Sequence, residues 1–247
     1  MIRAITFDLW DTIVIDDSDE EVRKKMGLPS KPLARLKLLS TEIKQHHKNI
    51  SEEKIAEAFA LANEKFNHHW KNEHFTPTVS ERLGYAYESL GIKSTPGFEN
   101  TVHEIELMEV EIMPLLAPGI EDALKKLSKT MDLAIISDAI HTPGTGLRQI
   151  LKKYNLQEYF SVFVFSDEAG VSKPSRKVFE LAQKDLGFNY GEIAHIGDRE
   201  SNDVTGPNNM GMKSILYTGI IDRASKNTKA SAICQHHSDL VKIVRNL

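Results

Sequence analysis

The chain has a single cysteine and no long apolar stretch. Cys234 is the only cysteine among 247 residues, which excludes an internal disulfide and suits a reducing compartment. No apolar run approaches the length that a transmembrane helix needs. The N-terminus also lacks the basic, apolar and small-residue regions of a secretory signal. From these absences we expect a cytoplasmic protein.

A strong excess of one charge is missing as well. The 31 lysines and arginines against 35 aspartates and glutamates give a formal net charge of -4. Such a balance provides no global attraction to nucleic acid or to an anionic membrane, so we expect neither as a partner. Any site for an anion must therefore be local. The chain shows no internal repeat or low-complexity tract, and nothing in it indicates an oligomeric state.

Strand and helix patterns alternate at the start of the chain and again after Pro114. Residues 1–7 are mostly apolar, which suits a strand buried on both faces that ends before Asp8. Further strands are predicted at Leu133–Ile136, Val162–Phe165, Ile193–Ile196 and Ser214–Tyr217. Helical patterns separate these strands, so we predict an α/β fold with a doubly wound parallel sheet and a Rossmann-like core.

Helical periodicity dominates between these two parts of the chain. Ser51 is a plausible N-cap for a helix whose apolar residues recur at helical spacing, and Thr78 with Glu81 forms a predicted capping box. The acidic run at residues 16–21 is most simply a solvated loop or an acidic first turn of a helix. We predict an all-helical domain at residues 16–113, inserted into a core formed by residues 1–15 and 114–247.

Polar residues follow four of the predicted strands. In chain order they are Asp8, Ser137, Lys173, and Asp198 with Asp203. Because the carboxyl ends of parallel strands meet at one edge of a sheet, we expect these side chains to converge there. Three clustered carboxylates would raise one another's pKa unless a cation offset their charge. A small set of hard oxygen ligands favours Mg²⁺, with water and a substrate phosphate completing its coordination.

The chain resembles the haloacid dehalogenase (HAD) superfamily of hydrolases through four motifs. They are DLWDT at residues 8–12, Ser137, Lys173-Pro174, and GDRESND at residues 197–203. Each motif alone is weak, but four in this order, each after a predicted strand, are specific. The resemblance extends over the whole core. The inserted helical block is similar to the cap that many members carry after the first strand.

The resemblance implies a catalytic role for three of these residues. Asp8 would be the nucleophile, forming an aspartyl ester or aspartyl phosphate that water then hydrolyses. Ser137 would hydrogen-bond the transferring group. Lys173 would neutralise charge on the nucleophile and on the phosphate. Taken singly, Ser137 could instead be a helix cap and Lys173 a surface lysine.

The resemblance also implies a metal site and a substrate site. The carboxylates of Asp8 and Asp198 and the backbone carbonyl of Trp10 would bind Mg²⁺, and Asp203 would orient or ligate it. Taken singly, Asp203 could instead cap the turn that follows it. We count Trp10 together with Thr12 and Asp138 as candidate substrate-binding residues.

The chain departs from the family pattern two residues after the nucleophile. Family phosphatases usually carry a second aspartate there, which protonates the leaving group and later activates water. This chain has Trp10 at that position and a carboxylate one residue later, at Asp11. We count Asp11 as a candidate catalytic substitute. An aromatic residue at this position is similar to the dehalogenase branch, in which halide departs without a proton.

Three functions follow from these residues. The first is a magnesium-dependent phosphohydrolase that acts on a small phosphate ester through an aspartyl-phosphate intermediate. The second is a metal-independent 2-haloacid dehalogenase, and the third is a low-turnover binding protein on the same fold. Asp198 favours the first over the second, because dehalogenases that resemble this chain generally lack the Gly-Asp pair. Retention of Asp8 argues against a pure binding protein.

Overall fold

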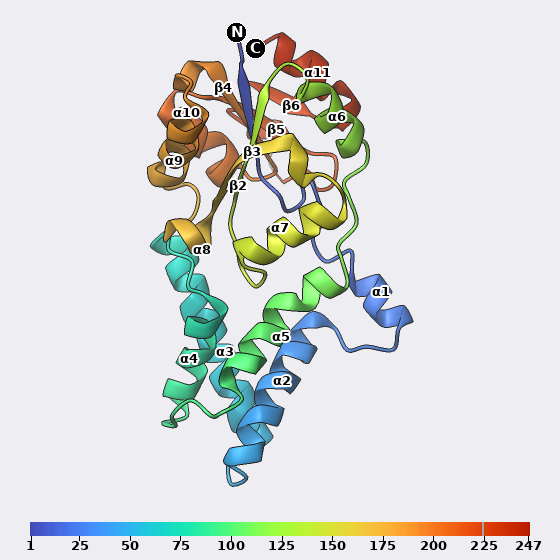
Figure 1. Cartoon of the computed structure of the whole chain (residues 1–247). Coiled ribbons are helices and arrows are strands. Elements are labelled where there is room, and N and C mark those ends of the chain that lie inside the picture. Colours follow the sequence, from blue (N-terminus) through green and yellow to red (C-terminus); the bar gives the residue numbers. More distant parts are fainter. Residues whose placement is uncertain (224) are drawn as a thin grey trace.

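A six-stranded parallel sheet forms the centre of the computed structural model, which describes residues 1–223 and 225–247 (Figure 1). The strands are β1 (Ala4–Phe7), β2 (Asp132–Ser137), β3 (Phe160–Phe165), β4 (Ile193–Gly197), β5 (Lys213–Tyr217) and β6 (Ala232–Cys234). They lie in the order β3-β2-β1-β4-β5-β6. The chain therefore winds outward in both directions from β1, and the predicted α/β fold is confirmed. Only β6 was not predicted, because three residues are too few to show an apolar pattern.

Helices cover both faces of the sheet, because successive residues of each strand point to opposite sides. In β2, Leu133 and Ile135 pack into one apolar cluster, and Ala134 and Ile136 pack into another. The first cluster includes residues of α6 (Ile120–Leu127), α7 (Gly144–Lys153) and α11 (His237–Arg245), and the second includes residues of α9 (Arg176–Leu186) and α10 (Gly206–Met210). The shorter elements are α8 (Ser166–Ala169), η1 (Gln157–Tyr159), η2 (Tyr190–Glu192), η3 (Glu200–Thr205) and η4 (Ser225–Asn227).

Six helices lie between β1 and β2 in the sequence, and all of them except α6 lie beyond one end of the sheet in space (Figure 1). The five inserted helices beyond the sheet are α1 (Glu20–Lys25), α2 (Lys31–His46), α3 (Glu52–Asn72), α4 (Val79–Ser89) and α5 (Phe98–Glu111). Two predicted caps are confirmed: Ser51 accepts a hydrogen bond from the backbone N of Lys54, and Thr78 and Glu81 form a capping box. Buried residues between Ala34 and Met108 give these helices an apolar cluster of their own.

The chain passes between the sheet and the inserted helices at one place. The backbone N of Ile15 donates to Leu115 O at 2.8 Å, and that of Ala117 donates to Ile13 O at 2.8 Å. The outgoing and returning segments therefore lie side by side. The division into residues 1–15 with 114–247 and residues 16–113 stays a prediction. Among the described helices, none combines the length and apolar character that crossing a membrane requires.

Candidate active site

The register of β1 and β4 brings two predicted carboxylates together. Phe7, the last residue of β1, is the partner of Ile196 in β4, and the backbone N of Asp8 donates to Ile196 O at 2.8 Å. β4 ends one residue later, at Gly197, and Asp198 follows. Both aspartates therefore leave the sheet at the same edge.

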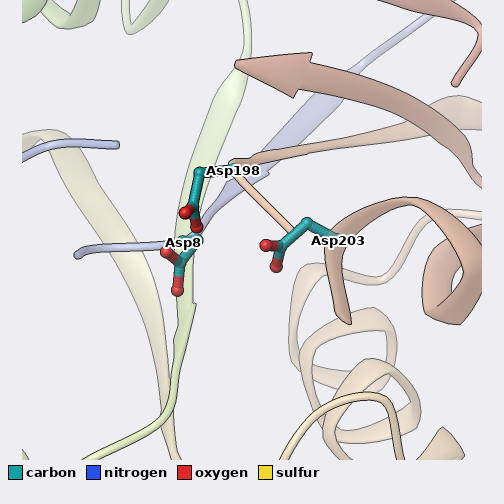
Figure 2. A group of neighbouring side chains, drawn as sticks. All are labelled: Asp8, Asp198 and Asp203. Atoms are coloured by element: carbon teal, nitrogen blue, oxygen red, sulfur yellow. The ribbon is translucent and has the colours of Figure 1, made fainter. Parts of the chain in front are cut away.

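Asp203 returns to this edge from η3. A Cβ atom on Gly197 would lie 2.3 Å from Asp203 Cγ, so only glycine allows this close approach. Asp8, Asp198 and Asp203 are buried, and each has a carboxylate oxygen within 4.8 Å of one on the others. Figure 2 shows the three side chains gathered at one point. Such a set of buried carboxylates suits a hard divalent cation.

Lys173 joins two of these carboxylates. Its Nζ donates to Asp8 Oδ1 at 2.6 Å and to Asp203 Oδ1 at 2.6 Å. Its backbone N donates to Asp138 Oδ1 at 3.0 Å, which fixes the loop that carries it. Only 3% of Lys173 is exposed, so it is not a surface lysine. Asp8 lines a cavity, and its Oδ2 has no hydrogen-bond partner in the described part of the chain.

The pKa values of the three carboxylates in this cluster are shifted in different directions. Burial raises the pKa of Asp8 to about 8 although Lys173 opposes the shift, and the charges of Asp203 and Asp198 add to it. Burial and Asp203 likewise raise the pKa of Asp198. Burial also opposes ionisation of Asp203, but Lys173 and His195 outweigh it and lower the pKa of Asp203. One lysine therefore does not balance three buried carboxylates, and a further cation would relieve their repulsion.

His195 supports Asp203 from within β4. The side chain is completely buried, with Nε2 at 3.0 Å from Asp203 Oδ1 and Nδ1 at 2.7 Å from Thr6 Oγ1. Burial lowers the pKa of His195 although Asp203 opposes the shift. A neutral ring that donates from Nε2 and accepts at Nδ1 satisfies both contacts. No sequence pattern indicated this contact, because no local pattern shows which partner a strand residue meets.

Of the remaining predicted residues, two line the cavity and two others are buried. Trp10 and Asp138 line the cavity beside Asp8. Ser137 is buried at the end of β2, where its Oγ lies 3.4 Å from Asp138 O. The carbonyl oxygen of Thr12 accepts a hydrogen bond from His237 Nε2 at 2.8 Å. The side-chain Oγ1 of Thr12 is buried with no partner among the described residues. The assignments of these residues to catalysis or substrate binding stay predictions.

Asp11 is held by two donors and is not part of the cavity wall. Its Oδ2 accepts from Arg223 Nη2 at 2.8 Å, and its Oδ1 accepts from the backbone N of Asp16 at 3.1 Å. Arg223 Nε donates in turn to Asp198 Oδ2 at 2.5 Å. Arg223 thus joins the candidate catalytic substitute to a candidate metal ligand. No sequence pattern indicated Arg223, because it lies in a loop more than two hundred residues after Asp11.

A cavity of about 640 Å³ opens in front of Asp8, within the usual range for a small-molecule site. Its core side includes Asp8, Trp10, Asp138, Lys173, Asn202 and Asp203, and its helical side includes Glu20, Ser30, Pro32, Arg35, Trp70 and Glu109. Trp70 Nε1 donates to Asp138 Oδ2 at 3.0 Å, so α3 contacts the core directly. The inserted helices therefore close one side of the cavity.

The acidic run after Ile15 contributes to that closure. Asp19 is completely buried and accepts from Lys31 Nζ at 2.8 Å, so its interpretation as a solvated residue is wrong. The reason is a lysine twelve positions later, whose approach depends on how α2 packs. Glu20 and Glu21 do form the predicted acidic first turn of a helix, at the start of α1.

The sequence profile described as haloacid dehalogenase-like hydrolase matches residues 2–211 of this chain. The chain belongs to this hydrolase family. The match begins before Asp8 and includes the segment from Asp198 to Asp203, so the whole carboxylate cluster lies within it. The resemblance inferred from the four motifs is confirmed, and the chain is an enzyme of the hydrolase class.

Several characterised relatives of this HAD hydrolase carry phosphatase names. A glyceraldehyde 3-phosphate phosphatase of Pyrococcus abyssi is 28% identical over 222 residues, which cover 88% of this chain and 82% of the relative. Its counterpart in Pyrococcus furiosus is 31% identical over 102 residues, covering 40% and 41%. The pyrimidine 5'-nucleotidase YjjG of Escherichia coli is 29% identical over 97 residues, covering 38% and 41%. The chain thus matches less than half the length of the last two relatives.

Solved structures share the fold over nearly the whole chain. The HAD phosphatase of Thermococcus onnurineus has a TM-score of 0.64 at 19% identity, with 98% of each chain covered. YfnB of Bacillus subtilis, described as a HAD-hydrolase bound to magnesium, has a TM-score of 0.63 at 16% identity, again with 98% of each covered. L-2-haloacid dehalogenase of Xanthobacter autotrophicus has a TM-score of 0.59 at 15% identity, with both chains fully covered. At these identities the likeness shows the fold and does not select an activity.

Proposed function

We propose that this HAD hydrolase is a magnesium-dependent phosphohydrolase that acts on a small phosphate ester. The observation that carries the proposal is the buried cluster of Asp8, Asp198 and Asp203 around Lys173 at the mouth of a cavity. The phosphatase names of relatives such as that of Pyrococcus abyssi support the same substrate class. The size of the cavity suits a small metabolite.

The donor set fits Mg²⁺. Three carboxylates supply hard oxygen ligands, and their mutual repulsion exceeds what Lys173 balances. We propose Asp8, Asp198 and the backbone carbonyl of Trp10 as ligands, with Asp203 as a ligand or as a residue that orients one. When bound, Mg²⁺ would offset negative charge on the phosphoryl group and its attacking oxygen.

The proposed reaction uses Asp8 Oδ2 as the nucleophile. Its attack on phosphorus forms an aspartyl phosphate and breaks the bond from phosphorus to the ester oxygen, which leaves as the alcohol after taking a proton. Water then attacks the same phosphorus and releases inorganic phosphate, which restores the Asp8 carboxylate. Lys173 holds Oδ1 of Asp8 and would offset the charge on the phosphoryl oxygens. Ser137 would hydrogen-bond the transferring group.

The source of the leaving-group proton is the atypical part of this proposal. Trp10 lines the cavity where family phosphatases carry an aspartate, and Asp11 is paired with Arg223 outside the cavity wall. This pairing favours a positioning role for Asp11 over proton transfer. General acid catalysis contributes about 10²- to 10⁴-fold to rate, so esters with poor leaving groups should react slowly without it.

We further propose that residues 16–113 act as a cap over the site. Trp70 of α3 contacts Asp138 of the core, and the backbone N of Ser172, beside Lys173, donates to His74 O at 2.7 Å. These contacts support a position of the inserted helices over the cavity. A cap that contacts the catalytic loops would exclude water and select the substrate.

Dehalogenation is the second candidate, and Trp10 is the observation that favours it. An aromatic wall beside the nucleophile suits the apolar halogenated carbon of a 2-haloacid, whose halide leaves without a proton. Both reactions need Asp8 as the nucleophile. They differ in the need for Asp198 and Asp203, since a metal-independent reaction has no use for two further buried carboxylates.

The deciding experiment measures two products under two conditions. Hydrolysis of p-nitrophenyl phosphate and halide release from L-2-chloropropionate are followed with Mg²⁺ and with excess chelator. We expect phosphate release that needs Mg²⁺ and no halide release. Halide release that is insensitive to chelator would overturn the phosphohydrolase proposal and establish the dehalogenase. Absence of both activities would favour the low-turnover binding protein.

A further inference from the structure

Two arginines of the inserted helices are buried with few partners. Arg35 of α2 is 6% exposed and Arg82 of α4 is 7% exposed. A guanidinium has five N–H donors, yet in the described part of the chain Arg35 donates only to Glu109 at 3.4 Å, and Arg82 only to Asn63 at 2.7 Å. Arg35 Nε and Arg82 Nη1 are buried with no partner. Burying so many unpaired donors is costly unless a ligand pairs with them.

The neighbouring carboxylates are engaged elsewhere. Asp17, Asp19 and Glu109 all lie within 3.0 Å of Lys31 Nζ. Glu109 Oε2 accepts from Thr142, so the carboxylate that pairs with Arg35 is shared among three donors. The charges of Asp17, Asp19 and Glu20 also act on Arg35. Burial and the charge of Arg35 lower the pKa of Arg82 to about 10. The unpartnered N–H donors of the two arginines are thus left for another acceptor.

The positive charge reaches the cavity that holds the candidate nucleophile. Arg35 and His141 both line this cavity, together with Asp8 and Lys173. Burial lowers the pKa of His141 well below its usual value, and Arg35, Arg82 and Lys31 lower it further. His141 is therefore neutral and offers one N–H donor in the cavity that Arg35 also lines.

We infer that Arg35, supported by Arg82 and faced by His141, binds a second anionic group of the substrate. The inference rests on the proposed phosphohydrolase function, because the first anionic group is the phosphate at Asp8. It names the substrate class as a phosphate ester that also carries a carboxylate or a second phosphate. A planar guanidinium pairs with either group through two parallel hydrogen bonds.

This substrate class differs from the one named for several relatives. Glyceraldehyde 3-phosphate has one anionic group, a phosphate, whereas 3-phosphoglycerate has a carboxylate in place of the aldehyde. The group that we expect Arg35 to bind is thus an acidic group at the end of the substrate away from the phosphate ester. An uncharged end would leave the donors of Arg35 unpaired.

The test compares esters that differ in one charge. kcat/KM is measured with Mg²⁺ for 3-phosphoglycerate against glycerol 3-phosphate, and for propane-1,3-diol bisphosphate against 3-hydroxypropyl phosphate. We expect at least about a 10-fold preference for the doubly charged member of one pair. The pair that shows it identifies carboxylate or phosphate as the bound group. Equal rates in both pairs, or a preference for the singly charged member, would overturn the inference.

Variants assign the preference to Arg35. Arg35→Gln should reduce the preference to about 2-fold or less, and Arg35→Lys should keep part of it because the charge remains without the second hydrogen bond. Arg176→Gln, the same change at an exposed arginine outside the cavity, should keep the full preference. A preference unchanged in both Arg35 variants would contradict the inference. If Arg35→Gln does not fold, the lysine variant and the wild-type ratios decide.

A binding measurement separates this inference from the proposed activity. Calorimetric titration with 3-phosphonopropionate and with propylphosphonate, in the presence of Mg²⁺, needs no turnover. Tighter binding of 3-phosphonopropionate by about 10-fold would support the anion site even if no ester were hydrolysed, in which case the phosphohydrolase proposal alone fails. Equal binding, combined with hydrolysis that shows no preference, would reject the anion site alone.

Discussion

Asp8 lies at the point where the charge of the whole site is balanced. One of its oxygens accepts from Lys173, and the other faces the cavity without a partner among the described residues. Burial raises its pKa to about 8, so the carboxylate needs nearby positive charge to be ionised at neutral pH. Asp203 has Lys173 and His195 beside it, and Asp198 has Arg223. Asp8 is therefore the carboxylate that gains most from a bound cation.

Asp8→Asn should reduce phosphate release by at least about 10³-fold, because an amide is a poor nucleophile. The measurement is p-nitrophenyl phosphate hydrolysis with saturating Mg²⁺. Asp185→Asn, the same change at an exposed residue, serves as the matched control and should keep wild-type activity. Activity retained in Asp8→Asn would remove the nucleophile role.

Asp11→Asn tests whether Asp11 transfers a proton or positions Arg223. The structure favours positioning, so we expect a several-fold higher Mg²⁺ concentration for half-maximal binding, because Asp198 would lose the support of Arg223. Mg²⁺ titration followed by calorimetry measures this directly. A larger loss of rate for alkyl than for aryl phosphates, with unchanged Mg²⁺ binding, would instead identify Asp11 as the general acid.

Helix α3 connects the inserted helices to the catalytic loops through one residue. Trp70 Nε1 donates to Asp138, which in turn accepts from the backbone N of Lys173. The contact therefore couples the position of α3 to that of the lysine loop. It also buries the indole against the cavity wall, where the ring of Phe66 lies 6.5 Å away.

Trp70→Phe keeps an aromatic ring and removes this hydrogen bond. A hydrogen bond to a carboxylate is worth about 1.5–3 kcal/mol, so we expect KM to rise by at least about 10-fold with a smaller change in kcat. Steady-state kinetics on the best substrate measure the effect. Tyr190→Phe, an aromatic change outside the cavity, is the control. An unchanged KM would show that α3 closes over the site without this contact.

Helix α11 begins at a histidine that is buried in its neutral form. His237 Nε2 donates to Thr12 O, and Nδ1 is buried without a partner in the described part of the chain. The imidazole ring also stacks on the ring of Tyr217, with the two ring centroids 4.1 Å apart. Burial lowers the pKa of His237 to about 4, and its contact with Thr12 opposes the shift. The helix thus contacts the nucleophile loop through a ring whose burial disfavours its charged form.

This arrangement predicts a pH dependence of stability. The unfolded histidine takes up its proton near pH 6.5, before the folded one does near pH 4. The contribution of His237 is therefore constant above about pH 6.5 and is lost as the pH falls through this window, by about 3 kcal/mol. Urea unfolding at pH 7.5 and pH 4.5 measures it. His237→Gln should show a smaller loss between the two pH values than the wild type, and an equal loss would contradict the assignment.

At the scale of the whole molecule, the apolar interior is divided. The inserted helices pack around their own cluster, and the sheet and its helices pack around two others. The carboxylates at the proposed metal site belong to the sheet side alone. We therefore expect a bound cation to stabilise the sheet and its helices more than the inserted helices.

Hydrogen exchange with and without Mg²⁺ tests this division. We expect Mg²⁺ to slow amide hydrogen exchange in β1, β4 and η3. Exchange in α4 and in the part of α3 distant from Trp70 should stay nearly unchanged. Mass spectrometry of peptides from each element provides the comparison, with Ca²⁺ as a control for cation size. Equal slowing in all elements would show that the two parts unfold as one unit.

The sheet and the edge that carries the nucleophile could be predicted from local sequence patterns. Apolar runs that end at Asp8 and Asp198 carry their own signal, because a buried strand needs a continuous apolar stretch and an aspartate ends it. Capping boxes such as that of Thr78 are equally local. Strand β6 was missed because three residues show no periodicity, and the burial of Asp19 was missed because its partner Lys31 is supplied by another element.

Which side chains meet across long sequence separations depends on the assembled structure. Arg223 beside Asp11, His195 beside Asp203, and Arg35 with an unpartnered Nε depend on how loops and helices pack, and packing is a property of the assembled chain. A lysine or arginine in a helix has the same local signal whether it is solvated or buried. Burial and pairing set its chemistry, and both appear only when distant segments come together.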